Sequence, residues 1–495
     1  MNIETLWNGL GEHIIGFLTE ADGSLVFCSL SFLATFIVFF TVYLALTPAR
    51  RWLQTAYVVA FSLFFAYKSN SILMILLPAT TILSWWLTRN IRQSKDYTLR
   101  RAWLLLVIVT DLLPLLYFKY ANSFLSICND LIGTNFSLLS IILPIGISFY
   151  TFQAISYSVD VYSKRFTEEV SLLDYAFFLS FFPLLFAGPI TRAETLIPQL
   201  KPARRKISQQ LVYTGLWLII IGLLKKGLVA DYVAQYNNWI FDDPTGFSGF
   251  EVAVGILGYA MQIYLDFSGY SDLSIGLAAI MGFRLLDNFD FPYRSLNLSE
   301  FWHRWHISLS TWVRDYIYIP LGGNRVGTFR KYLNNFIVMI VVGWWHGATW
   351  MFIIWGAMHG AGLVLHKAMK RWLDRIPDTL PIRFLSWLLT FLFVIVAWVF
   401  FRADSVDTAI DILRRSVTDF RGDYLMPFIE TRPTLTLFIA LGYALLFVGP
   451  HTYHRLRRLF VLTPWLVKAV LFIITVQLLL HFSNGSIQPF IYSQF

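Results

Sequence analysis

The stretch SLSFLATFIVFFTVYLAL, residues 29–46, indicates the class of protein. It contains no charged side chain, and apolar and polar residues do not alternate along it. A run of roughly 20 apolar residues is long enough to cross the hydrocarbon core of a bilayer as an α-helix. An outer-membrane barrel would instead require short strands of alternating hydrophobicity. The stretch therefore predicts a membrane-spanning helix and argues against a barrel.

The composition extends this prediction to the whole chain. Of its 495 residues, 57% are hydrophobic and 14% are charged, whereas about a quarter of the residues in a soluble domain are charged. Apolar runs recur throughout, with weaker ones at 172–188 and 268–283. The stronger candidate spans are 25–46, 54–67, 71–88, 102–118, 138–158, 211–224, 250–265, 333–349, 351–366, 384–401, 435–450 and 464–482. We expect an all-α polytopic protein with about 11 to 13 spans or half-spans, forming one integral-membrane domain over 1–495.

Cysteine content and net charge exclude other classes. Cys28 and Cys128 are too few for a disulfide framework or a thiolate metal cage. The net charge is +9, but no pattern typical of RNA or DNA binding accompanies it. Basic loops in a polytopic protein more often mark the cytoplasmic side of the membrane. We therefore expect membrane lipid, and not nucleic acid, as the surrounding partner.

The basic loops also predict an orientation. Residues 1–24 contain acidic side chains but no Lys or Arg, and Arg50 and Arg51 follow the first span. KPARRK, residues 201–206, marks a later cytoplasmic loop. Counting spans from these loops places both termini outside.

Two segments do not fit a simple alternation of loops between the inner and outer sides of the membrane. Residues 172–188 lie between two basic loops, so we expect them to re-enter the membrane without crossing it, which is possible where protein shields the backbone. Lys225 and Lys226 fall on the outer side by the count of spans, against the charge rule.

Charged residues gather in FWHRWHISLSTWVRDYIYIPLGGNR, residues 301–325. Ser299 is a suitable N-cap, so one helix is expected to run from there toward Pro320. On such a helix Arg304 and Asp315 share a polar face, opposite an aromatic one. A helix of this kind suits the cytoplasmic interface of a membrane, where aromatic residues are favoured.

The ionisable residues of this stretch admit more than one interpretation. Arg304, Arg314 and Arg325 could be simple positive-inside anchors or could bind an anionic ligand, and Arg325 follows a glycine-rich turn. His303 and His306 have a spacing that could bind metal, but no third ligand is evident, so we expect no metal. His306 lies beside aromatic positions and could be an ordinary buried histidine.

A second motif carries acidic residues within an apolar segment. YLDFSGYSD, residues 264–272, contains Asp266 and Asp272. Carboxylates inside a membrane require partners. A structural hydrogen-bonding role and a catalytic role are both open for them, and the same holds for Asp315.

The segment VVGWWHGATWMFIIWGAMHG, residues 341–360, contains the strongest candidate. Its flanking residues, Lys331 and Lys367, both look cytoplasmic, so the segment is expected to form a two-helix hairpin. His346 follows Lys331 by 15 residues, roughly 22 Å along a helix, which places it deep in the membrane near the turn. An ionisable group there is a functional candidate, and burial keeps it neutral and able to accept a proton. The alternative is a histidine bonded to a carbonyl of a neighbouring helix.

These two stretches together resemble the membrane-bound O-acyltransferase family, in particular the bacterial branch that contains alginate O-acetylation membrane proteins. Position 303 is more often arginine in that branch, which argues against a role for His303, and Ser493 stands where phenylalanine is common. Five further segments carry the same resemblance: PIGISFYTFQAISYSVDVY (144–162), FFPLLFAGPITR (181–192), YLDFSGYSDLSIGLA (264–278), WVFFRAD (398–404) and QPFIYSQF (488–495).

The resemblance implies a fold, a reaction and a location. The family fold is a ring of tilted helices around a central tunnel or paired funnels. His346 matches the family's catalytic histidine and His306 its second, cytoplasmic-side histidine, while Arg304, Arg314 and Arg325 would bind the donor. No bound cofactor is implied, because acetyl-CoA or another acyl thioester serves as donor substrate. The protein would lie in a bacterial inner membrane and pass the acyl group to an extracytoplasmic acetyltransferase that modifies a polysaccharide.

Two other functions remain open at this point. A proton-coupled transporter also uses buried histidines, but no paired broken helices occur in two matching halves. A teichoic-acid D-alanylation protein would take its acyl group from a carrier protein. The sequence does not distinguish the donors, the polymer or the partner.

Overall fold

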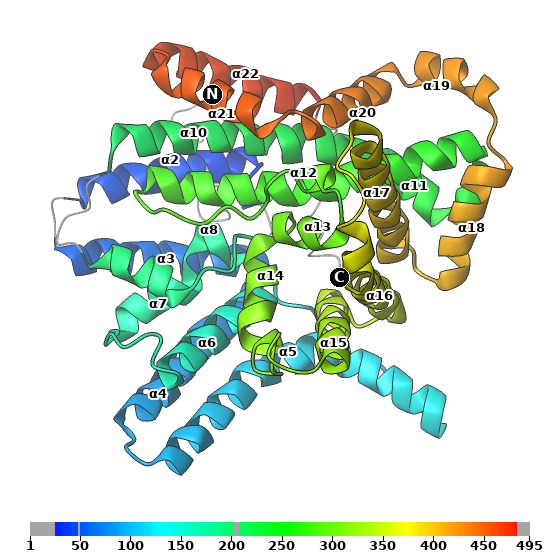
Figure 1. Cartoon of the computed structure of the whole chain (residues 1–495). Helices are drawn as coiled ribbons and strands as arrows, with labels where there is room; N and C mark the ends of the chain where they lie inside the picture. The colour runs from blue at the N-terminus through cyan, green and yellow to red at the C-terminus, as the bar shows by residue number, and fades with distance from the viewer. Residues whose placement is uncertain (1–24, 48–49, 202–206, 483–495) are drawn as a thin grey trace. The chain divides into compact units, whose positions relative to one another are not determined.

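The computed structural model describes residues 25–47, 50–201 and 207–482 (Figure 1). These residues form helices and no strands, which confirms the predicted all-α class. The acidic stretch 1–24, most of the basic loop 201–206 and Ser493 lie outside the described residues. The orientation predicted from the charged loops therefore stays a prediction.

The chain divides into two compact units, each assembled from separate segments. The long helix α5 (Tyr97–Ile132) belongs to both, and Pro114, inside this helix, is its last residue in the first unit. Of the described residues, the first unit contains 25–47, 50–114, 142–186 and 200–201, and the second contains 115–141, 187–199 and 207–482. The predicted single domain and the central tunnel stay predictions.

The first unit contains short and medium helices around a phenylalanine-rich core. The ring of Phe182 lies 5.4 Å from that of Phe39 and 5.8 Å from that of Phe65, measured between centroids. The segment expected to re-enter the membrane is two short helices separated at Phe181, and the freed backbone N–H of Phe182 donates to Ser62 Oγ at 3.1 Å. Besides part of α5, the helices are α2 (Leu30–Ala45), α3 (Arg51–Asn70), η1 (Ser71–Ile75), α4 (Leu76–Gln93), α6 (Ile147–Tyr162), α7 (Leu172–Ser180) and α8 (Phe182–Leu185).

The second unit holds the remaining helices. Two of them, η3 and η6, are π-helical turns, which are rare and occur often at functional sites. The elements are α9 (Ala193–Leu196), η2 (Ile197–Leu200), α10 (Gln209–Leu223), η3 (Leu224–Ala230), α11 (Asp231–Asp242), η4 (Pro244–Gly246), α12 (Gly249–Ile280), η5 (Pro292–Arg294), α13 (Leu298–Arg304), α14 (Ile307–Val313), η6 (Arg314–Tyr318), α15 (Thr328–His346), α16 (Trp350–Leu373), α17 (Leu380–Arg402), α18 (Val406–Thr418), η7 (Gly422–Tyr424), α19 (Leu425–Thr431), α20 (Pro433–Leu446), α21 (Pro450–Leu462) and α22 (Trp465–Phe482).

Several helical segments are long and apolar enough to cross a membrane, which supports a multi-pass protein. The described residues contain six such segments, or seven if the bent pair α20–α21 is one span. The six are Arg51–Gln93, Tyr97–Asn129, Gln209–Asp242, Gly249–Ile280, Leu380–Arg402 and Trp465–Phe482. This is fewer than the 11 to 13 spans or half-spans expected, because some apolar runs are not continuous helices: 138–158 becomes helical only at Ile147, and 172–188 divides at Phe181.

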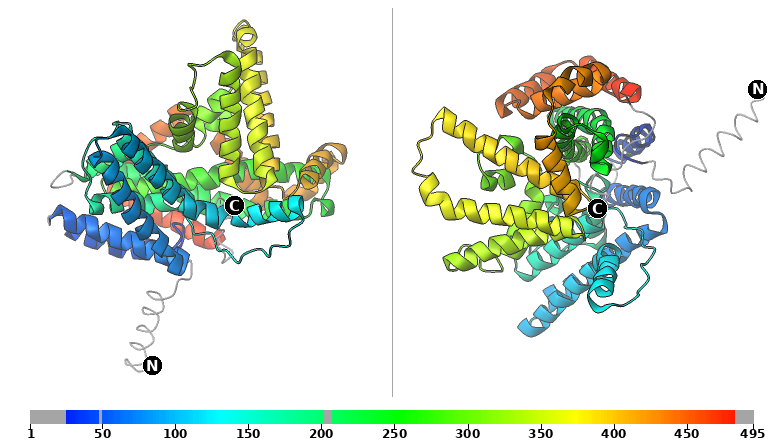
Figure 2. Two further views of the ribbon diagram at one scale, coloured as in Figure 1. Left: turned by 90° about the horizontal axis from the view of Figure 1, so that it is seen from below. Right: turned by 90° about the vertical axis from the view of Figure 1, so that its right-hand side faces the viewer.

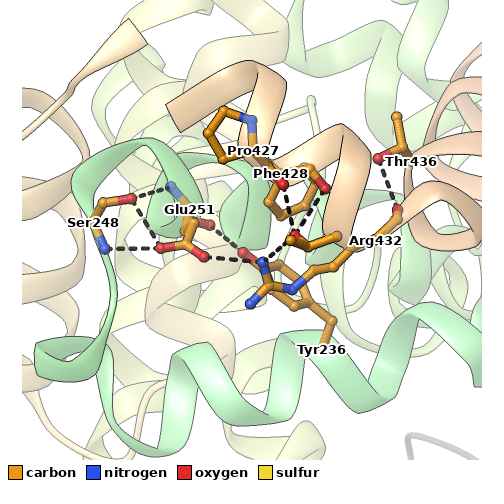
Figure 3. Close-up of polar contacts among 8 residues, drawn as sticks. Tyr236, Ser248, Glu251, Pro427, Phe428, Arg432 and Thr436 are labelled. Atoms are coloured by element: carbon orange, nitrogen blue, oxygen red, sulfur yellow. Dashed lines mark hydrogen bonds and ion pairs between the residues drawn. The ribbon is translucent and has the colours of Figure 1, made fainter. Parts of the chain in front are cut away.

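Helix α12 is the central element of the second unit, and most of its side chains are buried. A capping box begins it: Ser248 Oγ accepts from the Glu251 N–H, and the Glu251 carboxylate accepts from the Ser248 N–H (Figure 3). Glu251 also forms an ion pair with Arg432 at 3.3 Å. Along α12, the backbone approaches α10 so closely that a Cβ atom on Gly222 would lie 2.7 Å from the Gly269 carbonyl oxygen. Glycine at this position allows the two helices to pack backbone against backbone.

Helices α15, α16 and α17 follow one another as neighbours (Figure 2). The first two form the hairpin that the sequence predicts, and glycines again bring the backbones together: a Cβ atom on Gly356 would lie 2.5 Å from the Met339 carbonyl oxygen. The hairpin turns at residues 347–349. This turn is where the strongest candidate residue of the sequence lies.

Candidate functional site

His346 is the last residue of α15, directly before the turn to α16. Only 2% of its surface is exposed, so the prediction of a buried histidine at the hairpin turn is confirmed. Its ring is surrounded by aromatic rings, with centroids 4.9 Å from Trp345, 5.1 Å from Trp355 and 5.2 Å from Phe401. The imidazole is therefore held in an apolar cage.

The second predicted histidine shares one wall of this cage. His306 is fully buried, and its ring centroid lies 6.2 Å from that of Trp345 and 4.6 Å from that of Phe267 on α12. Trp345 thus contacts both His306 and His346, and the structure brings the two predicted histidines to one aromatic cluster. Burial lowers the pKa of His306 to about 3, so this imidazole is neutral at pH 7.

The helix predicted from Ser299 to Pro320 is wrong in one respect. The chain forms two short helices, α13 and α14, which are separated at His306, where the backbone is left-handed with φ +43°. The N-cap of α13 is Asn297, whose side chain accepts from the Glu300 N–H. The break arises because the N-terminal amides of α14 bond to a separate loop, and it turns His306 into the protein interior.

A third histidine extends the cluster on the far side of Trp355. His359 of α16 is fully buried, its ring centroid lies 4.8 Å from that of Trp355, and its Nδ1 accepts from Trp302 Nε1 at 3.2 Å. Three histidines and two tryptophans therefore alternate in space. We call them the histidine–tryptophan cluster, in the order His306, Trp345, His346, Trp355 and His359. The sequence places His359 in the same hairpin but gives no sign of this alternation.

Lys119 of α5 contacts the same turn, and sequence reasoning missed it. Its Nζ donates to the carbonyl oxygens of Trp345 at 2.7 Å and His346 at 2.9 Å. The neighbouring Tyr120 hydroxyl donates to the Trp344 carbonyl at 2.9 Å. These bonds satisfy carbonyls that the end of a helix leaves without intrahelical partners. A lysine at the end of an apolar run, as in PLLYFKY, is the sequence signal that would have identified it.

The three arginines predicted to bind the donor do not form one cluster. Arg304 pairs with Glu300 at 2.8 Å and reaches Asp290 at 3.9 Å, so two carboxylates already face its charge. Because α13 ends at Arg304 and Asp315 lies in η6, the two residues do not share a face of one helix, contrary to the prediction from a continuous helix.

Asp315 instead lies between two other arginines. It accepts from Arg314 Nε at 2.8 Å and from Arg192 Nη2 at 3.4 Å, and the Arg192 guanidinium lies 4.4 Å from the ring centroid of Tyr316. Asp315 thus pairs with two guanidinium groups, and the supporting polar role expected for it stays a prediction. Arg325 is exposed beyond the left-handed Gly322 and Gly323. Donor binding by Arg304, Arg314 and Arg325 stays a prediction.

The acidic residues of α12 answer a question that the sequence left open. Asp272 pairs with Lys225 at 2.7 Å, and Asp266 pairs with Lys226, which also reaches Asp231 at 2.7 Å. The lysines lie in the π-helical turn η3, between α10 and α11. The two lysines that did not fit the charge rule are the partners that the two aspartates require. This lysine–aspartate cluster, residues 225, 226, 231, 266 and 272, favours the structural role of Asp266 and Asp272.

An open pocket of about 800 Å³ lies beside the hairpin turn. Tyr120 and Phe124 of α5 form one side, and Trp344 and Thr349 form another. Asp404, directly after α17, adds a carboxylate to a lining that is otherwise mostly apolar. Trp344 and Thr349 precede and follow His346 in the chain, so the pocket lies beside the turn at which the buried histidine is placed.

Known proteins provide an independent comparison. The model of the membrane-bound O-acyltransferase family matches residues 61–405. The chain is 41% identical over 392 residues to the probable alginate O-acetylase AlgI of Azotobacter vinelandii, covering 78% of this chain and 76% of the relative. It is 37% identical over 393 residues to the peptidoglycan O-acetyltransferase of Helicobacter pylori, covering 74% and 73%. A teichoic acid D-alanyltransferase of Bacillus subtilis is 28% identical over 263 residues, covering 50% and 66%.

The family match includes every residue of the histidine–tryptophan cluster and of the lysine–aspartate cluster. The relatives above are named as acyl-transferring enzymes, and the described helices are those of a multi-pass membrane protein. The sequence, the fold and the comparisons therefore agree that this chain belongs to the membrane-bound O-acyltransferase family.

Proposed function

We propose that this acyltransferase moves an acetyl group from a cytoplasmic thioester donor, such as acetyl-CoA, across the inner membrane for O-acetylation of an extracytoplasmic polysaccharide. The observation that carries the proposal is the pair of neutral histidines at one aromatic cluster, in a chain about 40% identical to alginate O-acetylases. The donor, the direction of transfer and the partner are parts of the proposal.

The proposed chemistry uses a neutral histidine as a base. His346 takes the proton of an acceptor hydroxyl while the hydroxyl oxygen attacks the thioester carbonyl carbon. The tetrahedral intermediate then expels the thiolate, which receives the proton from the His346 imidazolium. An ester remains on the acceptor. General-base assistance of this kind contributes roughly 10²–10⁴-fold to the rate. The aromatic rings around His346 exclude water, which would otherwise compete as an acceptor.

The open pocket beside the hairpin turn is the proposed entrance for the acceptor. Its position next to Trp344 and Thr349 gives an acceptor hydroxyl a short route toward His346. Aromatic side chains such as Trp344 and Tyr120 also suit contact with the apolar face of a sugar. In this proposal the exported partner protein, or the polymer itself, presents the hydroxyl here.

The two candidate donors are distinguished by one assay. The purified protein in detergent is incubated with acetyl-CoA labelled in the acetyl group, with an exported polysaccharide or a hydroxyl model acceptor. We expect labelled ester to form and to require His346. Transfer from a D-alanyl carrier protein, with no transfer from acetyl-CoA, would favour the alternative function suggested by the more distant D-alanyltransferase relatives.

Access through the pocket can be tested in the same assay. The variant Ser123→Cys places a thiol on α5 in the pocket lining, in a background in which Cys28 and Cys128 are replaced by serine. Attachment of a bulky thiol reagent should block transfer, whereas the small methylthio group should reduce it less. Full activity of the bulky adduct would place the acceptor route elsewhere.

A further inference from the structure

The orientation of the Asn288 side chain follows from the backbone around it. Its Oδ1 atom lies 3.2 Å from the Ser308 backbone nitrogen, 2.9 Å from Ser308 Oγ and 3.1 Å from His306 Nδ1. A backbone N–H can only donate, so the amide atom that faces Ser308 must be the oxygen. The amide nitrogen then points to Ser271 Oγ at 3.2 Å, where it donates.

This orientation determines which ring nitrogen of His306 carries the proton. The Asn288 oxygen can only accept, so His306 Nδ1 must donate to it. In a neutral imidazole the other nitrogen, Nε2, then holds a lone pair. Among the residues that the structure describes, Nε2 of His306 is buried without a hydrogen-bond partner.

Asn288 also holds the backbone around His306. His306 lies in the left-handed region, with φ +43°, which few residues other than glycine adopt and which is enriched at functional sites. The Ile307 N–H donates to the Asn288 carbonyl at 2.9 Å, so Asn288 holds both the start of α14 and the ring of His306. One residue thereby keeps the strained backbone and the imidazole in place.

We propose that Asn288 is a positioning residue that keeps His306 protonated at Nδ1, so that Nε2 enters the reaction as a proton acceptor and not as a donor to the oxyanion. The proposal rests on the proposed function for the reaction in which His306 takes part. The assignment excludes one role for His306, because a neutral His306 of this form cannot stabilise a developing oxyanion through Nε2. His306, as a second base, contacts Trp345, which also contacts His346.

Asn288 and burial determine the protonation state of His306, because the acidic groups nearby are paired or exposed. His346 on α15 is the neighbouring titratable ring, and it shares Trp345 with His306. On α12, Asp266 and Asp272 are each paired with a lysine. In the loop before α13, Asp287 is exposed, and Asp290, also exposed, faces Arg304.

His359 provides an internal control, because its bonding is the reverse. The Trp302 indole N–H can only donate, so Nδ1 of His359 accepts and Nε2 carries the proton. Two buried neutral histidines of one protein are therefore expected in opposite tautomers. The ring ¹⁵N spectrum of histidine-labelled wild-type protein, assigned with His306→Gln and His359→Gln, tests this directly.

In this spectrum we expect Nε2 of His306 without a bound proton and Nε2 of His359 with one. A proton on Nε2 of His306 would overturn the proposal. This measurement does not depend on activity, so it separates a wrong tautomer from a wrong proposed function.

The variant Asn288→Asp tests the role in the reaction. A carboxylate still accepts from the Ser308 amide and from Nδ1, so the start of α14 is kept, but it stabilises the imidazolium and raises the pKa of His306. The base is lost as the pH falls through this pKa. We expect kcat/KM of the variant to fall more steeply between pH 8 and pH 5.5 than that of wild type. A tenfold fall would mean that the carboxylate raises the pKa of His306 to about one unit above pH 5.5, because the neutral fraction falls tenfold one pH unit below the pKa.

Asn297→Asp is the matched control, because Asn297 caps α13 through the Glu300 N–H in the same region. Its pH profile should equal that of wild type. An unchanged profile for a folded Asn288→Asp protein, or an equal shift in both variants, would show that Asn288 is only a helix cap. If Asn288→Asp does not fold, the ring ¹⁵N spectrum of the wild-type protein decides the question.

Discussion

The histidine–tryptophan cluster and the lysine–aspartate cluster are both buried polar regions of the second unit, but they are built in opposite ways. In the lysine–aspartate cluster, each lysine lies within ion-pair distance of an aspartate, as Lys226 does of Asp231 and Asp266. In the histidine–tryptophan cluster the imidazoles are packed against aromatic rings, and Nε2 of His306 and of His359 have no hydrogen-bond partner among the described residues.

The two kinds of cluster should contribute differently to stability and to the reaction. The partners of a buried ion pair compensate each other, so removing one partner leaves a costly uncompensated charge in the protein interior. A buried neutral imidazole leaves no uncompensated charge when it is removed, although its packing is lost, and it can accept a proton. We therefore expect substitutions in the lysine–aspartate cluster to change folding and substitutions in the histidine–tryptophan cluster to change the reaction.

The largest expected effect is that of His346→Ala. Loss of the proposed base should lower acyl transfer by about 10²–10⁴-fold, while the amount of folded protein in the membrane stays close to that of wild type. The assay is acetyl transfer per amount of monodisperse purified protein. Transfer by His346→Ala at the wild-type rate would reject His346 as the catalytic residue.

The next effect is that of Lys226→Met on stability. Lys226 is almost fully buried between two carboxylates, so its removal should destabilise the protein by about 3–5 kcal/mol. The measurement is the thermal unfolding midpoint of the detergent-solubilised protein. The triple variant Lys226→Met, Asp231→Asn and Asp266→Asn removes the uncompensated charges and should recover part of the loss; no recovery would mean that the charges are not the cause.

A smaller effect is expected at the exposed arginine. Arg325→Ala should raise the KM for the thioester donor several-fold with kcat unchanged, because Arg325 is exposed after a glycine turn and can meet an anionic donor. Arg304→Ala is the comparison. The Arg304 guanidinium faces Glu300 and Asp290, so its loss should also lower the stability of the protein, which the loss of Arg325 should not. A donor titration of Arg325→Ala identical to wild type would remove Arg325 from the donor site.

The smallest effect is expected for His303→Ala. His303 is exposed, and its Nδ1 lies 2.5 Å from the Ser299 carbonyl oxygen of the same helix. Its position also departs from the residue common in the family branch, so the variant should retain most of its activity. Complete loss of transfer with normal expression would contradict the account of the cluster, which excludes this residue.

Sequence alone predicts the parts of this protein that depend on local patterns. The apolar runs predict the helical class, and the flanking lysines predict the hairpin whose first helix ends at His346. Those patterns do not reveal that a helix breaks at His306, because the break depends on Asn288, which is 18 residues away in the chain. The pairing of Lys225 with Asp272 is equally hidden, because it depends on the close approach of α10 and α12.

The most direct test of the account measures two quantities on two variants. Acetyl transfer per amount of folded protein and the thermal unfolding midpoint are determined for His346→Ala and for Lys226→Met. The account predicts that His346→Ala loses transfer with a smaller fall in midpoint than Lys226→Met, because it leaves a cavity but no uncompensated charge. Lys226→Met should have the lower midpoint and, in the fraction that stays folded, retain transfer. Transfer lost by folded Lys226→Met and kept by His346→Ala would contradict the account.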